Sequence, residues 1–227
     1  PEELTRFNGF MSYEIQGSAA AGISSGVAMD EMDKISTSVN SNLMHAYSGA
    51  SYQERLASNQ SLILYSISLL VVFLCLAALY ESWSVPFSVL MVVPLGVFGA
   101  VLSIYFRDLS NDVYFQVALL AVMGLASKNA ILIVEFINSA YKDGENLLEA
   151  AIKGAKLRLR PIIMTSLAFI AGIIPLAIST GAGANSRIAI GTAILGGTIS
   201  ATILAIFFVP LFFVIIKKIF SKEVKNV

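Results

Sequence analysis

One lysine lies in the middle of an apolar segment that is long enough to cross a lipid bilayer. The segment covers residues 113–137, and Lys128 is fifteen residues from its start and nine from its end. At a helical rise of about 1.5 Å per residue, the lysine lies roughly 22 Å and roughly 14 Å from the two ends, too far to reach either membrane surface easily. A charge at this depth costs at least about 3 kcal/mol unless it is paired, so Lys128 is a candidate functional residue.

The apolar segments of this sequence hold no suitable partner of opposite charge for Lys128. Glu135 is the only acid in the same segment, and it lies seven residues on, about 10 Å further along a helix and too far for a direct ion pair. The other apolar segments contain no Asp or Glu. Either Lys128 stays neutral, or carboxylates outside this chain lie beside it. The second interpretation is favoured, because the sequence starts at Pro1 without a methionine and is expected to be the end of a longer protein.

Two further polar residues, Arg158 and Thr165, accompany the fourth apolar segment. They are seven residues apart, which places them on nearly the same face of a continuous helix. Pro161, between them, is expected in the first turn of the spanning helix. A membrane threonine usually bonds to a carbonyl of the preceding turn, and an arginine near the membrane surface often only anchors its helix. From spacing alone, these structural roles are favoured over a chemical one.

The composition indicates that membrane-spanning helices position these residues. Of the 227 residues, 56% are hydrophobic and 13% are charged, against about 25% charged in an average soluble domain. We therefore expect a membrane all-α fold. Five helices are predicted to cross the bilayer, at residues 61–80, 85–106, 113–137, 162–179 and 188–216. The formal net charge is zero, which gives no reason to expect nucleic-acid binding.

The positive charges predict how the helices are oriented. Of the fifteen Lys and Arg residues, five fall between Lys142 and Arg160 and four fall in the basic tail, 217–227. By the positive-inside rule both segments lie in the cytoplasm, and five crossings then place residues 1–60 outside. Residues 144–160 combine an apolar stripe with basic side chains, which predicts a helix lying on the cytoplasmic membrane surface.

Residues 1–60 are polar enough to belong to a soluble α+β domain. Strands are predicted at residues 12–17 and 43–47, on either side of a helix that Ser24 or Ser25 caps. The helix is predicted because apolar residues recur on one face: Ala28, Met32, Ile35 and Val39. A unit of this size is too small to bury a core alone.

No metal or cofactor site is predicted. His45 is the only histidine and has no Cys or His neighbour, so a surface or strand-packing role is favoured over metal binding. Cys75 is the only cysteine and cannot form an internal disulfide. The methionines scattered through the spans, Met91, Met123 and Met164, are explained more simply by packing than by metal transport.

Small residues recur at helical spacing in two spans and predict close helix contacts. They are Ala193, Gly197, Ala201 and Ala205 in one row, Thr192, Gly196 and Ser200 in a second, and Gly96, Gly99 and Ala100 in the second span. Such rows let helix backbones approach closely, and tight packing is favoured over a role in a substrate path.

Six segments of the chain together resemble a known family. They are GASYQERL (49–56), FLCLAALYESWSVP (73–86), NDVYFQ (111–116), KNAILIVEF (128–136), RLRPIIMTS (158–166) and STGAG (179–183). In this order, and over nearly the whole chain, they resemble the C-terminal part of the resistance-nodulation-division (RND) efflux pumps. The similarity is greatest to the acriflavine-resistance type, in the hydrophobe/amphiphile multidrug branch.

The resemblance implies a fold and a set of partners. The five spans would be the last five helices of a twelve-helix bundle, and residues 1–60 the end of a periplasmic porter subdomain and its connector. The whole protein would be a homotrimer in the bacterial inner membrane that works with a periplasmic adaptor and an outer-membrane channel.

The resemblance also implies a mechanism, drug export coupled to proton entry, with no cofactor and no catalysis. In the family, an aspartate pair in the first half of the protein takes up the proton and pairs with the lysine that matches Lys128. The residues that match Arg158 and Thr165 assist this relay, which raises the expectation that both have a chemical role. Two alternatives remain: an RND carrier of another cargo, such as a heavy metal or a protein-export accessory, and a non-transporting membrane scaffold.

Overall fold

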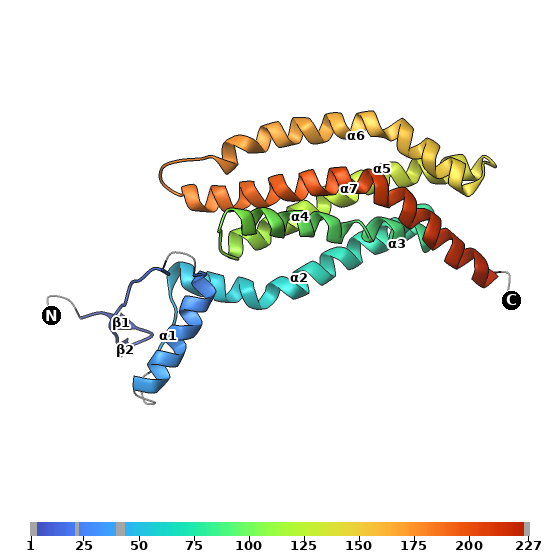
Figure 1. Cartoon of the computed structure of the whole chain (residues 1–227). Coiled ribbons are helices and arrows are strands. Elements are labelled where there is room, and N and C mark those ends of the chain that lie inside the picture. The colour runs from blue at the N-terminus through green and yellow to red at the C-terminus, as the bar shows by residue number, and fades with distance from the viewer. Residues whose placement is uncertain (1–3, 21–22, 40–43, 225–227) are drawn as a thin grey trace. The chain divides into compact units, whose positions relative to one another are not determined.

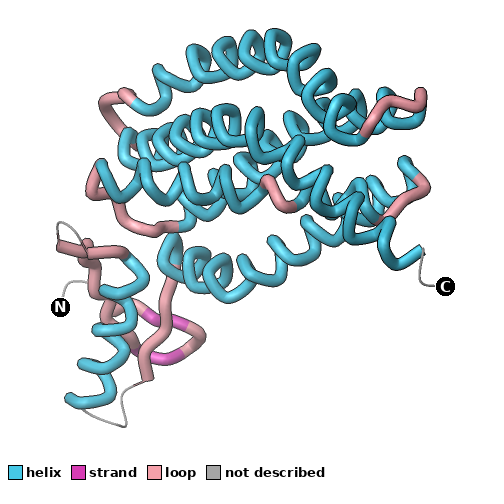
Figure 2. The backbone as a smooth tube through the Cα atoms, turned by 45° about the vertical axis from the view of Figure 1, so that its right-hand side comes forward, coloured by secondary structure: helices cyan, strands magenta, loops and turns pink. Residues whose placement is uncertain are grey.

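The chain divides into two compact units, Pro1–Tyr47 and Ser48–Val227 (Figure 1). The computed structural model describes residues 4–20, 23–39 and 44–224. Helices form nearly all of the second unit (Figure 2). Among the described residues, five helical segments are long and apolar enough to cross a membrane: Ile63–Tyr80, Ser84–Phe106, Val113–Lys142, Leu147–Ala177 and Ala184–Ile219. The predicted all-α membrane fold with five spans is therefore confirmed.

The second unit is built around its last helix. Its helices are α2 (Gly49–Tyr80), α3 (Ser84–Leu90), α4 (Val93–Phe106), α5 (Val113–Lys142), α6 (Leu147–Ala177) and α7 (Ala184–Val224). Helices α4, α5 and α6 all pack against α7, as Figure 1 shows. Most of the side chains buried among the described residues are apolar, and the buried polar ones are uncharged Ser, Thr and Asn.

The second span consists of two helices, α3 and α4, rather than one. Pro94 lies in the first turn of α4, where its missing N–H group would have no helical partner in any case. Other amides bridge the break: the N–H of Met91 donates to the carbonyl of Phe87, and that of Val92 to the carbonyl of Val89, both at 3.1 Å. The break therefore leaves little backbone unsatisfied, as a membrane segment requires.

The prediction that Pro161 begins a helix is wrong. Helix α6 begins at Leu147, and Pro161 lies inside it. Proline has no N–H group to donate to the carbonyl of Leu157, but membrane helices tolerate this loss because neighbouring groups compensate. One continuous helix thus joins the amphipathic segment 144–160 to the fourth span, and it holds Arg158 and Thr165 on nearly the same face.

The seam between α4 and α7 consists of the small residues that the sequence predicted to mediate packing. A Cβ atom added at Gly99 would lie 2.1 Å from the Cβ of Ser200 and 2.6 Å from the carbonyl oxygen of Gly196. The Ser200 hydroxyl donates to the carbonyl of Leu95 at 2.8 Å, and the Ser103 hydroxyl donates to that of Thr192 at 3.0 Å. The prediction of close helix contact is confirmed.

An arginine at the end of α4 ties three helices together. The Nη1 of Arg107 donates to the carbonyl of Ala177 at 3.0 Å and to the hydroxyl of Thr192 at 2.6 Å. Ala177 is the last residue of α6, so the guanidinium also lies at the negative end of that helix dipole. The sequence alone indicated only a linker at this position.

The first unit contains a short hairpin and one helix. Strands β1 (Arg6–Phe7) and β2 (Phe10–Met11) pair antiparallel, with Arg6 opposite Met11. The turn uses Asn8 and Gly9, both at positive φ, as a two-residue hairpin loop requires. Helix α1 (Ser25–Val39) is capped by Ser24, whose Oγ accepts from the N–H of Val27 at 3.3 Å.

The strands predicted in this unit are wrong for the part of the chain that the structure describes. Residues 12–17 and 44–47 form neither strand nor helix, and residue 43 lies outside the described residues. A segment becomes a strand only when another segment pairs with its backbone. Among the described residues 12–17, only Ser12, next to the hairpin, makes such a bond, from its N–H to the carbonyl of Thr5 at 3.1 Å. A short stretch of sequence cannot indicate whether that partner is present.

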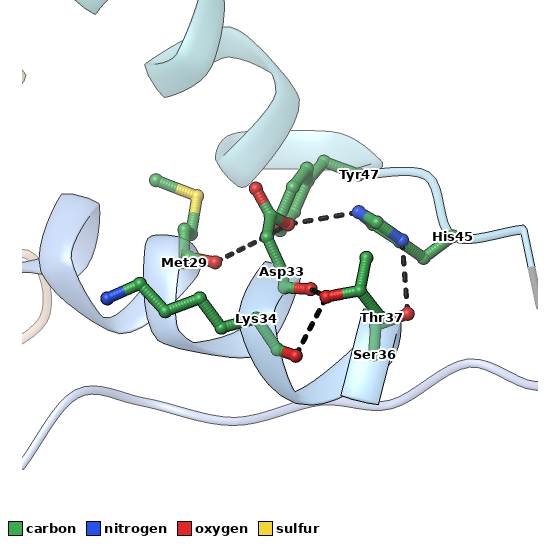
Figure 3. Close-up of polar contacts among 7 residues, drawn as sticks. All are labelled: Met29, Asp33, Lys34, Ser36, Thr37, His45 and Tyr47. Carbon is green, nitrogen blue, oxygen red and sulfur yellow. Dashed lines mark hydrogen bonds and ion pairs between the residues drawn. The ribbon is translucent and has the colours of Figure 1, made fainter. Parts of the chain in front are cut away.

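His45 fastens the segment after α1 to that helix, as Figure 3 shows. Its Nδ1 lies 3.1 Å from the Ser36 hydroxyl and its Nε2 lies 3.0 Å from the Asp33 carboxylate. The Tyr47 hydroxyl donates to the carbonyl of Met29 at 2.8 Å and also bonds to Asp33. His45 is exposed, so the surface role predicted for it is confirmed, whereas the described residues around it, 44–47, form no strand for it to pack on.

Asp112 caps the N-terminus of α5, and burial of its charge makes this contribution to stability depend on pH. Its carboxylate accepts a hydrogen bond from the N–H of Phe115 at 2.8 Å. Burial raises the pKa of the Asp112 carboxyl, and the bond from Phe115 only partly opposes this shift. Because the pKa in the folded state is raised, the carboxyl stabilises the fold most at low pH, and this contribution is lost as pH rises through the folded pKa.

Replacements of Asp112 should therefore separate capping from charge. Asp112→Asn keeps a capping oxygen and removes the buried charge, so it should match or exceed wild-type stability at neutral pH, with the advantage shrinking on acidification. Asp112→Ala removes the cap and should lower the free energy of unfolding by about 1 kcal/mol. Thermal unfolding of the purified protein at neutral and acidic pH measures both effects. If Asp112→Asn were less stable than Asp112→Ala, the capping role of Asp112 would be wrong.

Candidate functional site

Lys128 lies near the middle of α5 and on the surface of the second unit. Its side chain is exposed, whereas its neighbours Ser127 and Asn129 are buried. Among the described residues it forms neither an ion pair nor a hydrogen bond. The ammonium is thus presented at mid-span to whatever lies beside α5 outside this chain.

Arg158 lies on α6 and contacts an aromatic ring on α5. Its Cζ is 3.8 Å from the centroid of the Phe136 ring. Its Nε is buried and has no hydrogen-bond partner among the described residues. Within the described residues, this charge therefore contacts a ring face and no carboxylate.

Thr165 is exposed one turn beyond Pro161, and its hydroxyl donates to the carbonyl of Ile162 at 3.1 Å. This is the local bond expected of a threonine in a membrane helix. The hydroxyl oxygen still has lone pairs that can accept a bond from a cation. The adjacent Ser166 is buried and accepts from the Thr202 hydroxyl at 2.9 Å, which links α6 to α7.

The structure does not bring the three candidate residues into direct contact. Arg158 and Thr165 share α6, Lys128 belongs to α5, and within the described part of the chain no hydrogen bond joins any two of them. Sequence reasoning missed Phe136 and Thr202, whose roles depend on contacts between helices. The sequence does not single out Thr202, because Thr192, Thr198 and Ser200 lie in the same span.

The described residues contain no group of three or more His, Cys, Asp or Glu side chains placed to hold a metal ion. What the geometry provides is a mid-span cation, a ring-supported guanidinium and a hydroxyl on two adjacent helices. Such an arrangement can exchange hydrogen bonds and ion pairs with carboxylates. It has no nucleophile activated by a base.

Comparison with known proteins decides the family. The model of the AcrB/AcrD/AcrF family matches residues 1–217. This chain belongs to that family. The resemblance to RND efflux pumps of the acriflavine-resistance type is thereby confirmed, and so is a multi-pass membrane protein.

Several curated relatives in this family are similar over almost the whole chain. The toluene efflux pump membrane transporter TtgB of Pseudomonas putida is 54% identical over 222 residues, which is 97% of this chain and 21% of the relative. The multidrug resistance protein MdtF of Escherichia coli is 56% identical over 220 residues, 96% of this chain and 21% of the relative. The multidrug export protein AcrF of Escherichia coli is 54% identical over 219 residues. The chain thus spans about a fifth of the length of these proteins.

Proposed function

We propose that this chain is the C-terminal part of a proton-driven multidrug efflux transporter. The observation that carries the proposal is Lys128, a mid-span cation without a partner in the described part of a chain from this family. A charge at mid-span is costly unless it is paired, so such a charge usually marks a functional site. A proton-coupled relay gives Lys128 both a partner and a function, whereas a membrane scaffold gives it neither.

The proposed relay uses an aspartate pair in the part of the transporter outside this chain. While the carboxylates are ionised, they hold the Lys128 ammonium. When a proton neutralises them, the attraction falls, and Lys128 turns to other acceptors such as the Thr165 hydroxyl. A change of charge pairing at low local dielectric is strong enough to bias a two-state helix rearrangement.

Arg158 assists by offering hydrogen-bond donors to the same carboxylates. The energy source is the proton-motive force, and no cofactor takes part. The transporter is a homotrimer in the bacterial inner membrane, and it delivers hydrophobic and amphiphilic drugs to a periplasmic adaptor and an outer-membrane channel.

A chimera tests the function directly. In this chimera, the present chain replaces the matching fifth of MdtF. The chimera is expressed in Escherichia coli that lacks its own drug pumps. We expect drug resistance and dye efflux, both lost when a protonophore collapses the proton gradient. A chimera that is present in the membrane at normal amounts but exports nothing, or that exports without a gradient, would overturn the proposal.

The same chimera discriminates the alternative cargo. TtgB is named for toluene, and MdtF and AcrF are named for multidrug resistance and export, which favours organic cargo over metal ions. Strains expressing the chimera should therefore gain resistance to dyes and detergents and none to toxic metal salts. The opposite pattern would favour the metal carrier.

The orientation of the spans is tested by thiol labelling of the chimera after its other cysteines, including Cys75, are replaced. A cysteine at Asn185 should react with an impermeant reagent in intact cells, because it lies in the first turn of α7, next to a short outer connection with little positive charge. A cysteine at Lys222, in the basic tail, should react only after permeabilisation. Reversed labelling would contradict the positive-inside assignment.

A further inference from the structure

The contact between Arg158 and Phe136 lies beside a close approach of α5 and α6. A Cβ atom added at Gly154 would lie 2.6 Å from the Cγ1 and 2.9 Å from the backbone nitrogen of Ile137. Gly154 is buried, and Ile137 is fully buried. The two helices therefore meet backbone to backbone at this point.

This crossing sets the position of both partners. Phe136 directly precedes Ile137 on α5, and Arg158 follows Gly154 by four residues, which is one turn along the same face of α6. The Cζ of Arg158 lies 3.8 Å from the ring centroid of Phe136, well within the distance at which a cation is attracted to a ring face. The pairing thus follows from the helix crossing rather than from a chance side-chain conformation.

A ring holds a guanidinium differently from a carboxylate. The five N–H donors of arginine lie in the guanidinium plane, whereas an aromatic ring attracts the cation through its face. The ring can therefore support the charge without using up its hydrogen bonds. The buried Nε of Arg158, which has no hydrogen-bond partner among the described residues, agrees with this arrangement.

We propose that Phe136 is a positioning residue for Arg158. The Phe136 ring holds the Arg158 guanidinium against α5, the helix that also carries Lys128. The N–H donors of the guanidinium stay available to carboxylates that gain and lose a proton. This inference rests on the proposed function, because it gives Arg158 a share in the relay. It adds a residue whose side chain neither carries nor accepts a proton.

The test compares non-aromatic and aromatic replacements in the full-length transporter, reconstituted into liposomes with an imposed proton gradient. Phe136→Leu and Phe136→Met keep an apolar side chain and remove the ring, whereas Phe136→Tyr keeps the ring face. We expect the two non-aromatic variants to lower the maximal transport rate about tenfold with little change in the KM for the drug. Phe136→Tyr should retain most of the rate. Phe98→Leu, which removes an exposed ring on α4, is the matched control and should behave as wild type.

The double variant Phe136→Leu with Arg158→Gln decides whether the ring acts through the arginine. If it does, Phe136→Leu causes no further loss once Arg158 is replaced. Additive losses, equal losses in the Leu and Tyr variants, or wild-type transport by Phe136→Leu while Arg158→Gln is inactive would each overturn the positioning role and leave the relay intact. Wild-type transport by Arg158→Gln would instead remove Arg158 from the relay, and the proposal for Phe136 would fall with it.

Discussion

Lys128→Ala should abolish drug export by the full-length transporter while leaving the protein in the membrane at normal amounts. Removing a charge at mid-span lowers the cost of inserting α5, so the variant has no reason to be lost during assembly. It does remove the cation that the proton-binding carboxylates hold. Minimum inhibitory concentrations and proton-coupled transport in liposomes, both at equal protein amount, measure the effect, and wild-type resistance would refute the relay.

Two companion variants define what Lys128 contributes. Lys128→Arg should also fail, because a planar guanidinium does not replace a compact ammonium and does not release its proton. Glu135→Gln is the matched control on the same helix. Glu135 is exposed and lies only two residues before residue 137, the predicted end of the span, so water and lipid headgroups can solvate it. It should keep a substantial share of transport. An equal loss in Glu135→Gln would place an essential carboxylate within this chain.

The features that the sequence predicted correctly are those that the bilayer imposes on any chain. A spanning helix must satisfy its own backbone and stay apolar over about 20 residues, so length and composition alone locate the five spans. The same constraint makes Lys128 conspicuous, because a single charge contradicts its surroundings. Small residues at four-residue spacing likewise have few explanations other than close helix packing, which Gly99 and Gly196 show here.

The features that it missed depend on residues far apart in the chain. Arg107 bonds to the carbonyl of Ala177, seventy residues away, and Ser103 bonds to that of Thr192, eighty-nine residues away. No local pattern contains such a pairing. The ring beneath Arg158 is hidden for the same reason, since Phe136 reads as one more apolar residue of a span. The strand predicted at residues 12–17 is wrong for a related reason, because a strand needs a backbone partner from another part of the chain.

The α4–α7 seam offers a test in which one chemical change has two very different costs. Gly99→Ala would place a methyl group 2.6 Å from a backbone oxygen, that of Gly196, which cannot move unless the helices separate. Gly96→Ala, three residues earlier on α4, would meet only side-chain atoms, of which the nearest, Cγ1 of Val122, lies at 3.0 Å. We expect Gly99→Ala to lower the free energy of unfolding by about 3 kcal/mol, the upper end of the range for overpacking. Gly96→Ala should lose much less, because alanine favours the helix by about 1 kcal/mol over glycine.

Thermal unfolding of the purified transporter in detergent measures this difference, and a second substitution identifies its cause. The added methyl group at position 99 would also lie 2.1 Å from the Cβ of Ser200, so Ser200→Gly removes that clash but leaves the one with the Gly196 carbonyl. It also removes the bond from the Ser200 hydroxyl to the Leu95 carbonyl. The double variant Gly99→Ala with Ser200→Gly should therefore recover only part of the lost stability. Ser200→Gly alone measures the cost of the lost hydrogen bond. If the double variant is as stable as Ser200→Gly, a side chain alone sets the spacing of α4 and α7, whereas a further loss of stability shows that their backbones are in contact.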